Sequence, residues 1–215
     1  MMPVETIGAY TLRQSDDCFK LGRDSVLLSQ FATLRRGDTV CDLGCGVGTL
    51  LLLLSARTAD IRRWGVEMDA RAAALARENL LENGLDGTIL EDDLRRPALL
   101  PVSHFKLVIS NPPYFEAGSG KSGGPARMEE ALTLSELCAV AQRITRTGGR
   151  FALSYRPERL PELFAALTAA QFAPKRLRLL AHAPQKPPFA ALVEAVRGGK
   201  AGLEILPQHY ETMDE

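Results

Sequence analysis

Residues 106–115 read KLVISNPPYF, and this stretch predicts a buried strand that ends in a polar tip. The three apolar residues at 107–109 are typical of a central parallel strand, which is covered on both faces. The double proline that follows has no N–H to donate, so strand pairing ends there. Asn111 is therefore expected at the carboxyl end of the strand, where open α/β sheets bind their ligands.

The polar tip carries the groups that a planar NH2 donor would need. The carboxamide oxygen of Asn111 and the carbonyl of Pro112 can both accept hydrogen bonds from such a donor. Tyr114 offers a ring for stacking on a flat substrate, which is worth roughly 1–3 kcal/mol per base. The lone pair of an exocyclic amine is delocalised into its ring, and two acceptors that pull its hydrogens out of plane favour the attacking form. The alternative interpretation of Asn-Pro-Pro-Tyr is a plain tight turn.

A glycine-rich turn lies nearer the amino terminus. A strand predicted over 39–43 runs into the pattern D-x-G-x-G-x-G, which begins at Asp42 and includes Gly44 and Gly46. Glycines at such a turn let the backbone approach a ligand closely. The dinucleotide fingerprint is G-x-G-x-x-G instead, and a carboxylate here would repel a pyrophosphate and attract a cation. S-adenosylmethionine carries a sulfonium and an ammonium group, so Asp42 favours this cofactor over NAD. A strand-to-helix turn without a ligand is the alternative.

Two further turns supply acids for the same ligand. One predicted strand ends at Glu67, about twenty residues after the glycines, where an acid can accept both ribose hydroxyls of a nucleoside. Met68 follows it and is assigned to the same site. Another strand, over 88–90, leads into an acidic turn in which Asp93 would accept the adenine amino group while Leu94 packs on the ring. A solvated acidic turn is the alternative for Asp93.

The first 35 residues form a lead-in to this core. They predict an extended piece around 7–12 and a helix over 25–33. Asp24 directly precedes that helix and is interpreted either as its N-cap or as part of a segment, 19–24, that folds over the ligand. In the second interpretation Asp24 belongs to the cofactor site.

The carboxyl-terminal half predicts alternating elements and then a hairpin. A helix over 133–146, capped by Gly148 and Gly149, precedes a strand over 150–154 and a helix that starts at Pro157. Two strands then follow with no helix between them, which implies an antiparallel hairpin; they are predicted over 175–180 and 189–196. We expect one domain over 1–215, with a core over 36–207.

Composition excludes several classes of protein. At 215 residues and 46% hydrophobic content, the chain is long enough for one sizeable core. The four cysteines and three histidines lack metal-ligand spacing, so no metal site is expected. No segment is apolar enough to predict a membrane span or a signal peptide, which favours a reducing cytoplasmic location. The sequence favours a monomer without establishing it.

Any nucleic-acid surface must be a local patch, because the net charge is zero. The candidate RNA-binding residues are Arg127, Arg156, Arg159, Lys175 and Arg176. A solvated charged sheet edge that discourages aggregation is the alternative.

From about Gln14 to Pro207 the chain resembles the class I S-adenosylmethionine-dependent methyltransferases, and among them the bacterial tRNA1(Val) adenine-37 N6-methyltransferases. The resemblance to the class rests on the four patterns above in this order. The narrower match rests on further residues and segments, which are Gln14, Phe19, Asp24-Ser-Val-Leu-Leu28, Asn111 to Phe115, Ala126-Arg127 with Glu129, Tyr155-Arg-Pro-Glu-Arg-Leu160, Pro174-Lys-Arg176 and Gly202-Leu-Glu-Ile-Leu-Pro207. It implies a Rossmann-like α/β fold with a seven-stranded, mostly parallel sheet, a carboxyl-terminal antiparallel hairpin and helices on both faces.

The resemblance also implies roles for the residues of the four patterns. Asn111, Pro112 and Tyr114 would hold the target adenine; the cofactor residues would be Asp42, Gly44, Glu67 and Asp93. Met128 stands where relatives of this type often have histidine.

Other acceptors present the same NH2 group to Asn-Pro-Pro-Tyr. A protein glutamine methyltransferase acting on release factors is one alternative, although such enzymes usually carry a helical amino-terminal domain that 35 residues cannot form. Guanine N2 methylation of ribosomal RNA is another. A cofactor-binding RNA chaperone without turnover is disfavoured, because a pure binder has no need of both acceptors beside a methyl donor.

Overall fold

The computed structural model describes residues 4–14, 22–96, 100–112 and 132–211. The strands are β1 (Val4–Ile7), β2 (Tyr10–Arg13), β3 (Asp38–Leu43), β4 (Ile61–Glu67), β5 (Gly87–Glu91), β6 (Phe105–Ser110), β7 (Thr145–Tyr155), β8 (Phe172–Ala181), β9 (Ala190–Arg197), β10 (Glu204–Ile205) and β11 (His209–Tyr210). The helices are α1 (Arg23–Phe31), α2 (Thr49–Arg57), α3 (Ala70–Glu82), α5 (Leu134–Ile144), the 3-10 turn η1 (Pro157–Arg159) and α6 (Leu160–Ala169).

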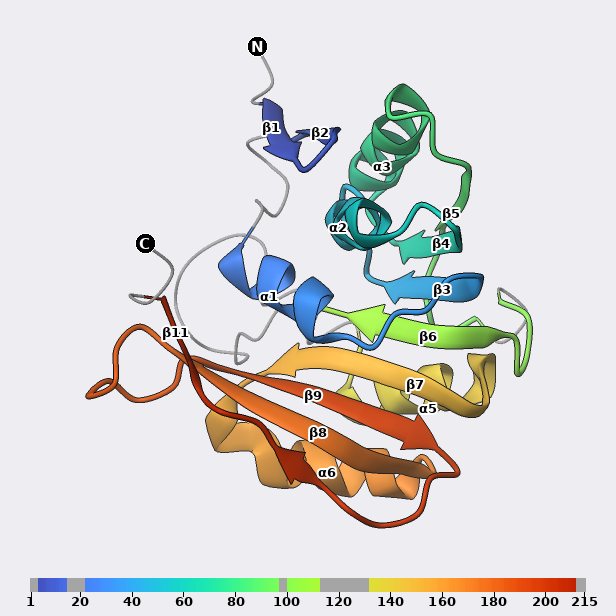
Figure 1. Cartoon of the computed structure of the whole chain (residues 1–215). Coiled ribbons are helices and arrows are strands. Elements are labelled where there is room, and N and C mark those ends of the chain that lie inside the picture. Colours follow the sequence, from blue (N-terminus) through green and yellow to red (C-terminus); the bar gives the residue numbers. More distant parts are fainter. Residues whose placement is uncertain (1–3, 15–21, 97–99, 113–131, 212–215) are drawn as a thin grey trace.

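One sheet runs through the molecule in the order β5-β4-β3-β6-β7-β9-β8 (Figure 1). The first five strands are parallel, and β9 is antiparallel to both of its neighbours. The predicted seven-stranded core with a closing antiparallel hairpin is therefore confirmed. Two strands of two residues each, β10 and β11, pair with β8 and were not predicted, so the sheet has nine strands in the described residues.

Helices cover both faces of this sheet, as the sequence predicted (Figure 1). α1, α2 and α3 lie on one face, where Leu51 and Leu54 pack in the same core cluster as Leu107 and Ile109 of β6. α5 and α6 lie on the other, in a second cluster. β3 and β6 are the central strands and are buried along nearly their whole length, which explains the apolar run at 107–109 of β6.

The start of β7 corrects one prediction. α5 begins at Leu134, after the N-cap Thr133, whose side chain forms a capping box with Glu136, but it ends at Ile144 and not at a glycine cap. Thr145 has extended backbone and pairs with Phe105, so the strand starts directly after the helix. Gly148 and Gly149 lie inside β7, where its register with β6 shifts. Gly148 has φ +74°, which explains glycine at that irregularity.

The lead-in contains a hairpin instead of one extended piece. β1 and β2 pair with each other and turn at Gly8, which has φ +58°. Asn79 of α3 and Asn83, the C-cap of the same helix, dock the hairpin: Asn83 Oδ1 accepts from Thr11 N (2.8 Å) and its Nδ2 donates to Thr11 O (2.7 Å). Asn79 Oδ1 likewise accepts from Arg13 N at 2.9 Å, and its Nδ2 donates to Arg13 O at 3.0 Å. These side-chain amides take the place of a neighbouring strand along β2.

The described residues contain no helix long and apolar enough to cross a membrane. They also contain no group of three or more His, Cys, Asp or Glu side chains placed to hold a metal ion. Cys41, Cys45 and Cys138 are buried thiols.

Candidate active site

The candidate site lies at the carboxyl edge of the parallel strands. The register pairs Asp42 of β3 with Gly65 of β4 and with Ile109 of β6. The ends of these three strands, and the residues directly after them, therefore meet at one edge. This brings together Asp42, Glu67 and Asn111, which the sequence assigned to one site.

The glycine turn has the backbone geometry that only glycine adopts readily. Gly44 and Gly46 have φ of +78° and +52°. The N–H groups of Gly44 and Cys45 both donate to Val66 O, at 2.9 and 3.0 Å, which fastens the turn to β4. A Cβ added at Gly46 would meet no atom within 4 Å in the described structure, so this residue needs glycine for its φ and not for lack of space.

Asp42 is the buried carboxylate of the site. Its side chain lies in a residue that is 1% exposed, and its Oδ1 atom has no hydrogen-bond partner among the described residues. Burial, and then the neighbouring Glu67 carboxylate, raises the pKa of Asp42 well above its ordinary value. A buried carboxylate oxygen without a donor is costly, and the ammonium or hydroxyl donors of S-adenosylmethionine would satisfy it. The Asp42 carboxylate therefore fits the hydrogen-bond donors of this cofactor.

Glu67 ends β4 and is already part of a backbone network. Its Oε2 accepts from Gly46 N at 2.8 Å and its Oε1 from Asp69 N at 2.9 Å. A carboxylate has about four acceptor positions, so two remain for ribose hydroxyls. The next residue, Met68, is half exposed, at 50%, and offers an apolar side chain at the same edge.

The acidic turn after β5 differs from the expectation. Both carboxylate oxygens of Asp93 bind the Arg95 guanidinium, with Nη2 to Oδ2 at 2.5 Å. The side-chain hydrogen bonds from Arg95 hold the pKa of Asp93 at about 2. An adenine amino group would share this carboxylate with Arg95. Leu94 does lie at the site, in the wall of a pocket.

Asn111 follows β6 directly, as predicted, and its side chain meets α1. Its Nδ2 donates to Asp24 Oδ2 and to Ser25 Oγ, both at 2.9 Å. Asp24 is not the N-cap, because Gly22 holds that position and Asp24 lies in the first turn. Asp24 therefore lies at the site, as in the second interpretation of the sequence, but its observed contact is with Asn111.

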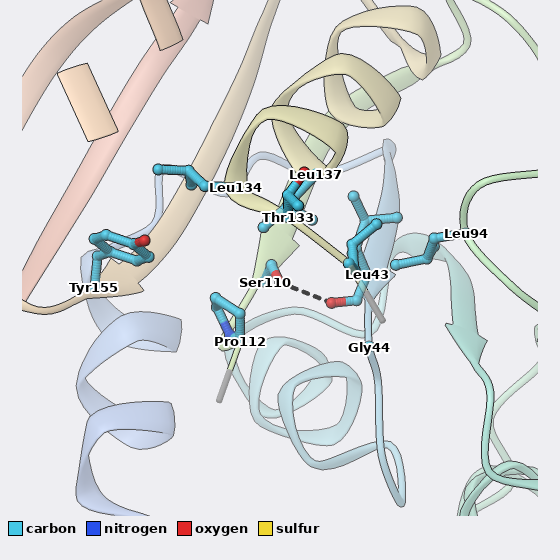
Figure 2. Close-up of a pocket in the computed structure, with 10 residues that line it drawn as sticks. Leu43, Gly44, Leu94, Ser110, Pro112, Thr133, Leu134, Leu137 and Tyr155 are labelled. Atoms are coloured by element: carbon cyan, nitrogen blue, oxygen red, sulfur yellow. Dashed lines mark hydrogen bonds between the residues drawn. The ribbon is translucent and has the colours of Figure 1, made fainter. Parts of the chain in front are cut away.

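A pocket opens beside these residues, between the end of the sheet and α5 (Figure 2). Figure 2 shows Pro112 and Tyr155 on one side, Leu94 on the other and Ser110 between them, where its hydroxyl donates to Leu43 O at 2.7 Å. Sequence analysis assigned no role to Ser25, Ser110 or Tyr155. Ser110 and Tyr155 could have been found as the last residues of adjacent parallel strands, whereas nothing local marks Ser25.

The structure does not bring the predicted basic patch together. Arg156 and Arg159 directly follow β7 at the carboxyl edge, and the Arg159 guanidinium lies 5.3 Å from the centre of the Tyr155 ring. Lys175 lies near the start of β8, at the opposite edge, and donates to Lys200 O. The Arg176 side chain points inwards, and its Nη1 donates to Phe31 O at 2.9 Å. Tyr114 and Arg127 lie outside the described residues.

A sheet of this order, with a buried acid and a glycine turn where its first parallel strand ends, is the framework of the class I S-adenosylmethionine-dependent methyltransferases. The chain belongs to the methyltransferase small domain family, whose model matches residues 17–158.

Curated relatives and solved structures agree with this class. A tRNA1(Val) (adenine(37)-N6)-methyltransferase from Serratia proteamaculans is 35% identical over 157 residues, which are 68% of this chain and 60% of the relative. The enzyme of the same name from Dickeya chrysanthemi is 30% identical over 95% of this chain and 85% of its own length. An Agrobacterium tumefaciens protein solved as a "predicted O-methyltransferase" superposes with TM-score 0.71 and 26% identity, over 87% of this chain and 86% of that one. A Pyrococcus furiosus methyltransferase shares the fold, with TM-score 0.67 and 15% identity over 88% and 90%.

Proposed function

We propose that this protein transfers a methyl group from S-adenosylmethionine to N6 of an adenine in tRNA, with adenosine 37 of tRNA1(Val) as the expected target. The observation that carries the proposal is the placement of Asn111 and Pro112 at the end of β6, one strand away from Asp42 and the glycine turn. The names of the relatives from Serratia and Dickeya support the choice of base and RNA.

The cofactor would supply an electrophilic methyl group on a sulfonium. Asp42 and Glu67 would bind its polar groups, with Met68 and Leu94 beside its adenine. On the substrate side, Asn111 Oδ1 and Pro112 O would accept the two hydrogens of the target amine. The transfer would replace the methyl carbon–sulfur bond by a bond to the amine nitrogen, and the proton displaced from that nitrogen would pass to water. Two fixed acceptors stabilise the positive charge that develops on those hydrogens.

Phosphate contacts would hold the RNA at the same edge. Arg156 and Arg159 are the described basic residues of the predicted patch that lie there, and we assign them this role. Contacts of this kind release counterions, so tRNA affinity should fall steeply as salt rises. A tRNA substrate is consistent with a cytoplasmic location. We further propose a monomer.

The proposal is tested by supplying labelled S-adenosylmethionine with total tRNA from a strain that lacks the gene. The modified nucleoside should be N6-methyladenosine. Release factor carrying an exposed glutamine, and ribosomal RNA, should be assayed beside it over a salt series. Strong transfer to the release factor with none to tRNA would overturn the substrate assignment in favour of glutamine methylation.

Asn111→Ala is the sharpest variant for the chemistry. Cofactor affinity should stay within about twofold of the parent, because Asn111 acts on the incoming amine. The rate of methyl transfer should fall on the order of 10²–10³-fold, by analogy with removal of one group that stabilises transition-state charge. Calorimetry and single-turnover kinetics measure the two quantities. Transfer at the parent rate would show that Asn111 has no role in the reaction.

A further inference from the structure

The helix α1 contributes two side chains that touch the predicted catalytic amide. Asp24 and Ser25 lie in its first turn, 87 and 86 positions away from Asn111 in the sequence. Asp24 Oδ2 and Ser25 Oγ each lie 2.9 Å from Asn111 Nδ2. The other oxygen of Asp24 accepts from Ser25 N at 2.9 Å, which fixes the carboxylate against its own helix.

The chemistry of these partners settles which end of the carboxamide faces α1. A carboxylate is only an acceptor, so the group that Asn111 turns towards Asp24 must be its NH2 and not its oxygen. That nitrogen has two hydrogens, and the two acceptors on α1 account for both. The Asn111 oxygen consequently lies on the side of the amide that faces away from Asp24 and Ser25.

We infer that Asp24 and Ser25 are positioning residues that fix the orientation of the Asn111 amide, so that the site accepts substrates offering an N–H and rejects those offering a carbonyl at the same place. The inference rests on the proposed function, in which the Asn111 oxygen accepts from the target amine. A freely rotating amide would present NH2 to the substrate for part of the time, and that orientation cannot accept a hydrogen bond. Adenine fits the fixed orientation, whereas hypoxanthine, with oxygen in place of the amine, would place two acceptors against each other.

This role differs from a direct contact between Asp24 and the cofactor, and a double-variant cycle separates the two. Asp24→Ala and Ser25→Ala should each leave cofactor affinity within about twofold of the parent and lower the single-turnover rate, on the order of 10–100-fold for Asp24→Ala, because misplacement of about 1 Å can cost that much. In an Asn111→Ala background, Asp24→Ala should have no further effect on rate. The inference would be overturned if Asp24→Ala lowered the rate by the same factor in the Asn111→Ala background as in the parent. A cofactor dissociation constant that rises tenfold with Asp24→Ala would also overturn it.

Ser29→Ala is the matched control for Ser25→Ala. Ser29 is one turn further along α1, is also buried, and its hydroxyl donates to Val26 O within the same helix. The control should keep the parent rate. An equal loss in Ser25→Ala and Ser29→Ala would indicate a general loosening of α1 and would refute a role through Asn111.

Nuclear magnetic resonance tests the geometry without any substrate. In protein labelled with ¹⁵N-asparagine, the side-chain NH2 signal of Asn111 is identified by its absence in Asn111→Ala. Its hydrogens should exchange slowly with solvent in the parent protein and about tenfold or more faster in Asp24→Ala. Equal exchange in both proteins would overturn the inference. If the parent transfers no methyl group to tRNA, the proposed function fails, while this measurement still decides the orientation of the amide.

Discussion

Replacing Arg176 by alanine should destabilise the fold more than any other change in the predicted basic patch. The Arg176 side chain is 29% exposed, and its Nη1 lies within hydrogen-bond distance of Phe31 O (2.9 Å), Thr33 Oγ1 (3.0 Å) and Glu194 Oε1 (3.3 Å). Its guanidinium also lies 4.6 Å from the centre of the Phe31 ring. Glu194, at 3% exposed, would lose its strand partner.

The magnitude follows from these contacts. Nη1 has two hydrogens, so two of the three hydrogen bonds are counted, each worth about 1.5–3 kcal/mol when a charged group takes part. Removing one partner of a buried pair typically costs about 3–5 kcal/mol, and partial exposure places Arg176 at the lower end. A cost of about 3 kcal/mol lowers the melting temperature by roughly 6–12 °C for a chain of this length.

Thermal melts and urea unfolding of Arg176→Ala measure this cost. Lys175→Ala is the control, because the neighbouring side chain makes a solvent-exposed hydrogen bond to Lys200 O; its change should stay within about 0.5 kcal/mol. In tRNA binding, replacing Arg156 and Arg159 together should flatten the salt slope by about two units, while Arg176→Ala should leave the slope unchanged. A melting temperature within about 2 °C of the parent, or a flattened slope in Arg176→Ala, would refute this reasoning.

Two further predictions concern Asp42 and the docked hairpin. Because the folded protein raises the pKa of Asp42, it binds that proton more tightly than the unfolded chain does, so the stability of the cofactor-free protein should fall as pH rises from about 4 through the raised pKa. Asp42→Asn should remove that decline in urea unfolding at a series of pH values and weaken cofactor binding in calorimetry; an unchanged decline would contradict the assignment. Asn79→Ala should lower the free energy of unfolding by about 3 kcal/mol, because it leaves the Arg13 N–H and the Val47 carbonyl without their buried partner. Because Val47 belongs to the glycine turn, the same change should also weaken cofactor binding. Asn83→Ala, at a more exposed position, should cost about 1 kcal/mol, and equal costs in urea unfolding would contradict the burial argument.

The central strands could be predicted because their signal is local. An apolar run such as residues 107–109 is buried on both faces by helices, whatever the rest of the chain does. The end of α5 could not be predicted in the same way. Thr145 bonds back to Ala141 O through both its N–H and its hydroxyl and then pairs with β6, which is a tertiary contact. The double glycine marks the irregularity in β7 instead of the helix end.

The predicted basic patch failed to assemble because its described members lie at opposite edges of the sheet. β7 and β8 both run antiparallel to β9, so the start of β8, with Lys175 and Arg176, lies away from the end of β7, which Arg156 follows. The register of β8 also shifts between Pro174 and Arg176, so simple strand alternation does not set the directions of these side chains. The cross-strand partner of Arg176 is Glu194, a buried carboxylate that attracts the guanidinium. Charge composition alone does not reveal such a partner, because Glu194 lies 18 positions away in the sequence.

α1 connects these observations, because it is held at both of its ends. At its carboxyl end, Arg57 donates to Ser29 O and Ala32 O, and Arg176 donates to Phe31 O, which places cations where the helix dipole is negative. At its amino end, Asp24 and Ser25 hold the Asn111 amide. A helix fixed at both ends has little freedom to shift or rotate, so the position of Asp24 depends partly on contacts at the far end. Arg176→Ala should therefore lower the rate of methyl transfer as well as the stability, but by less than Asp24→Ala, because the amino-terminal contacts remain intact.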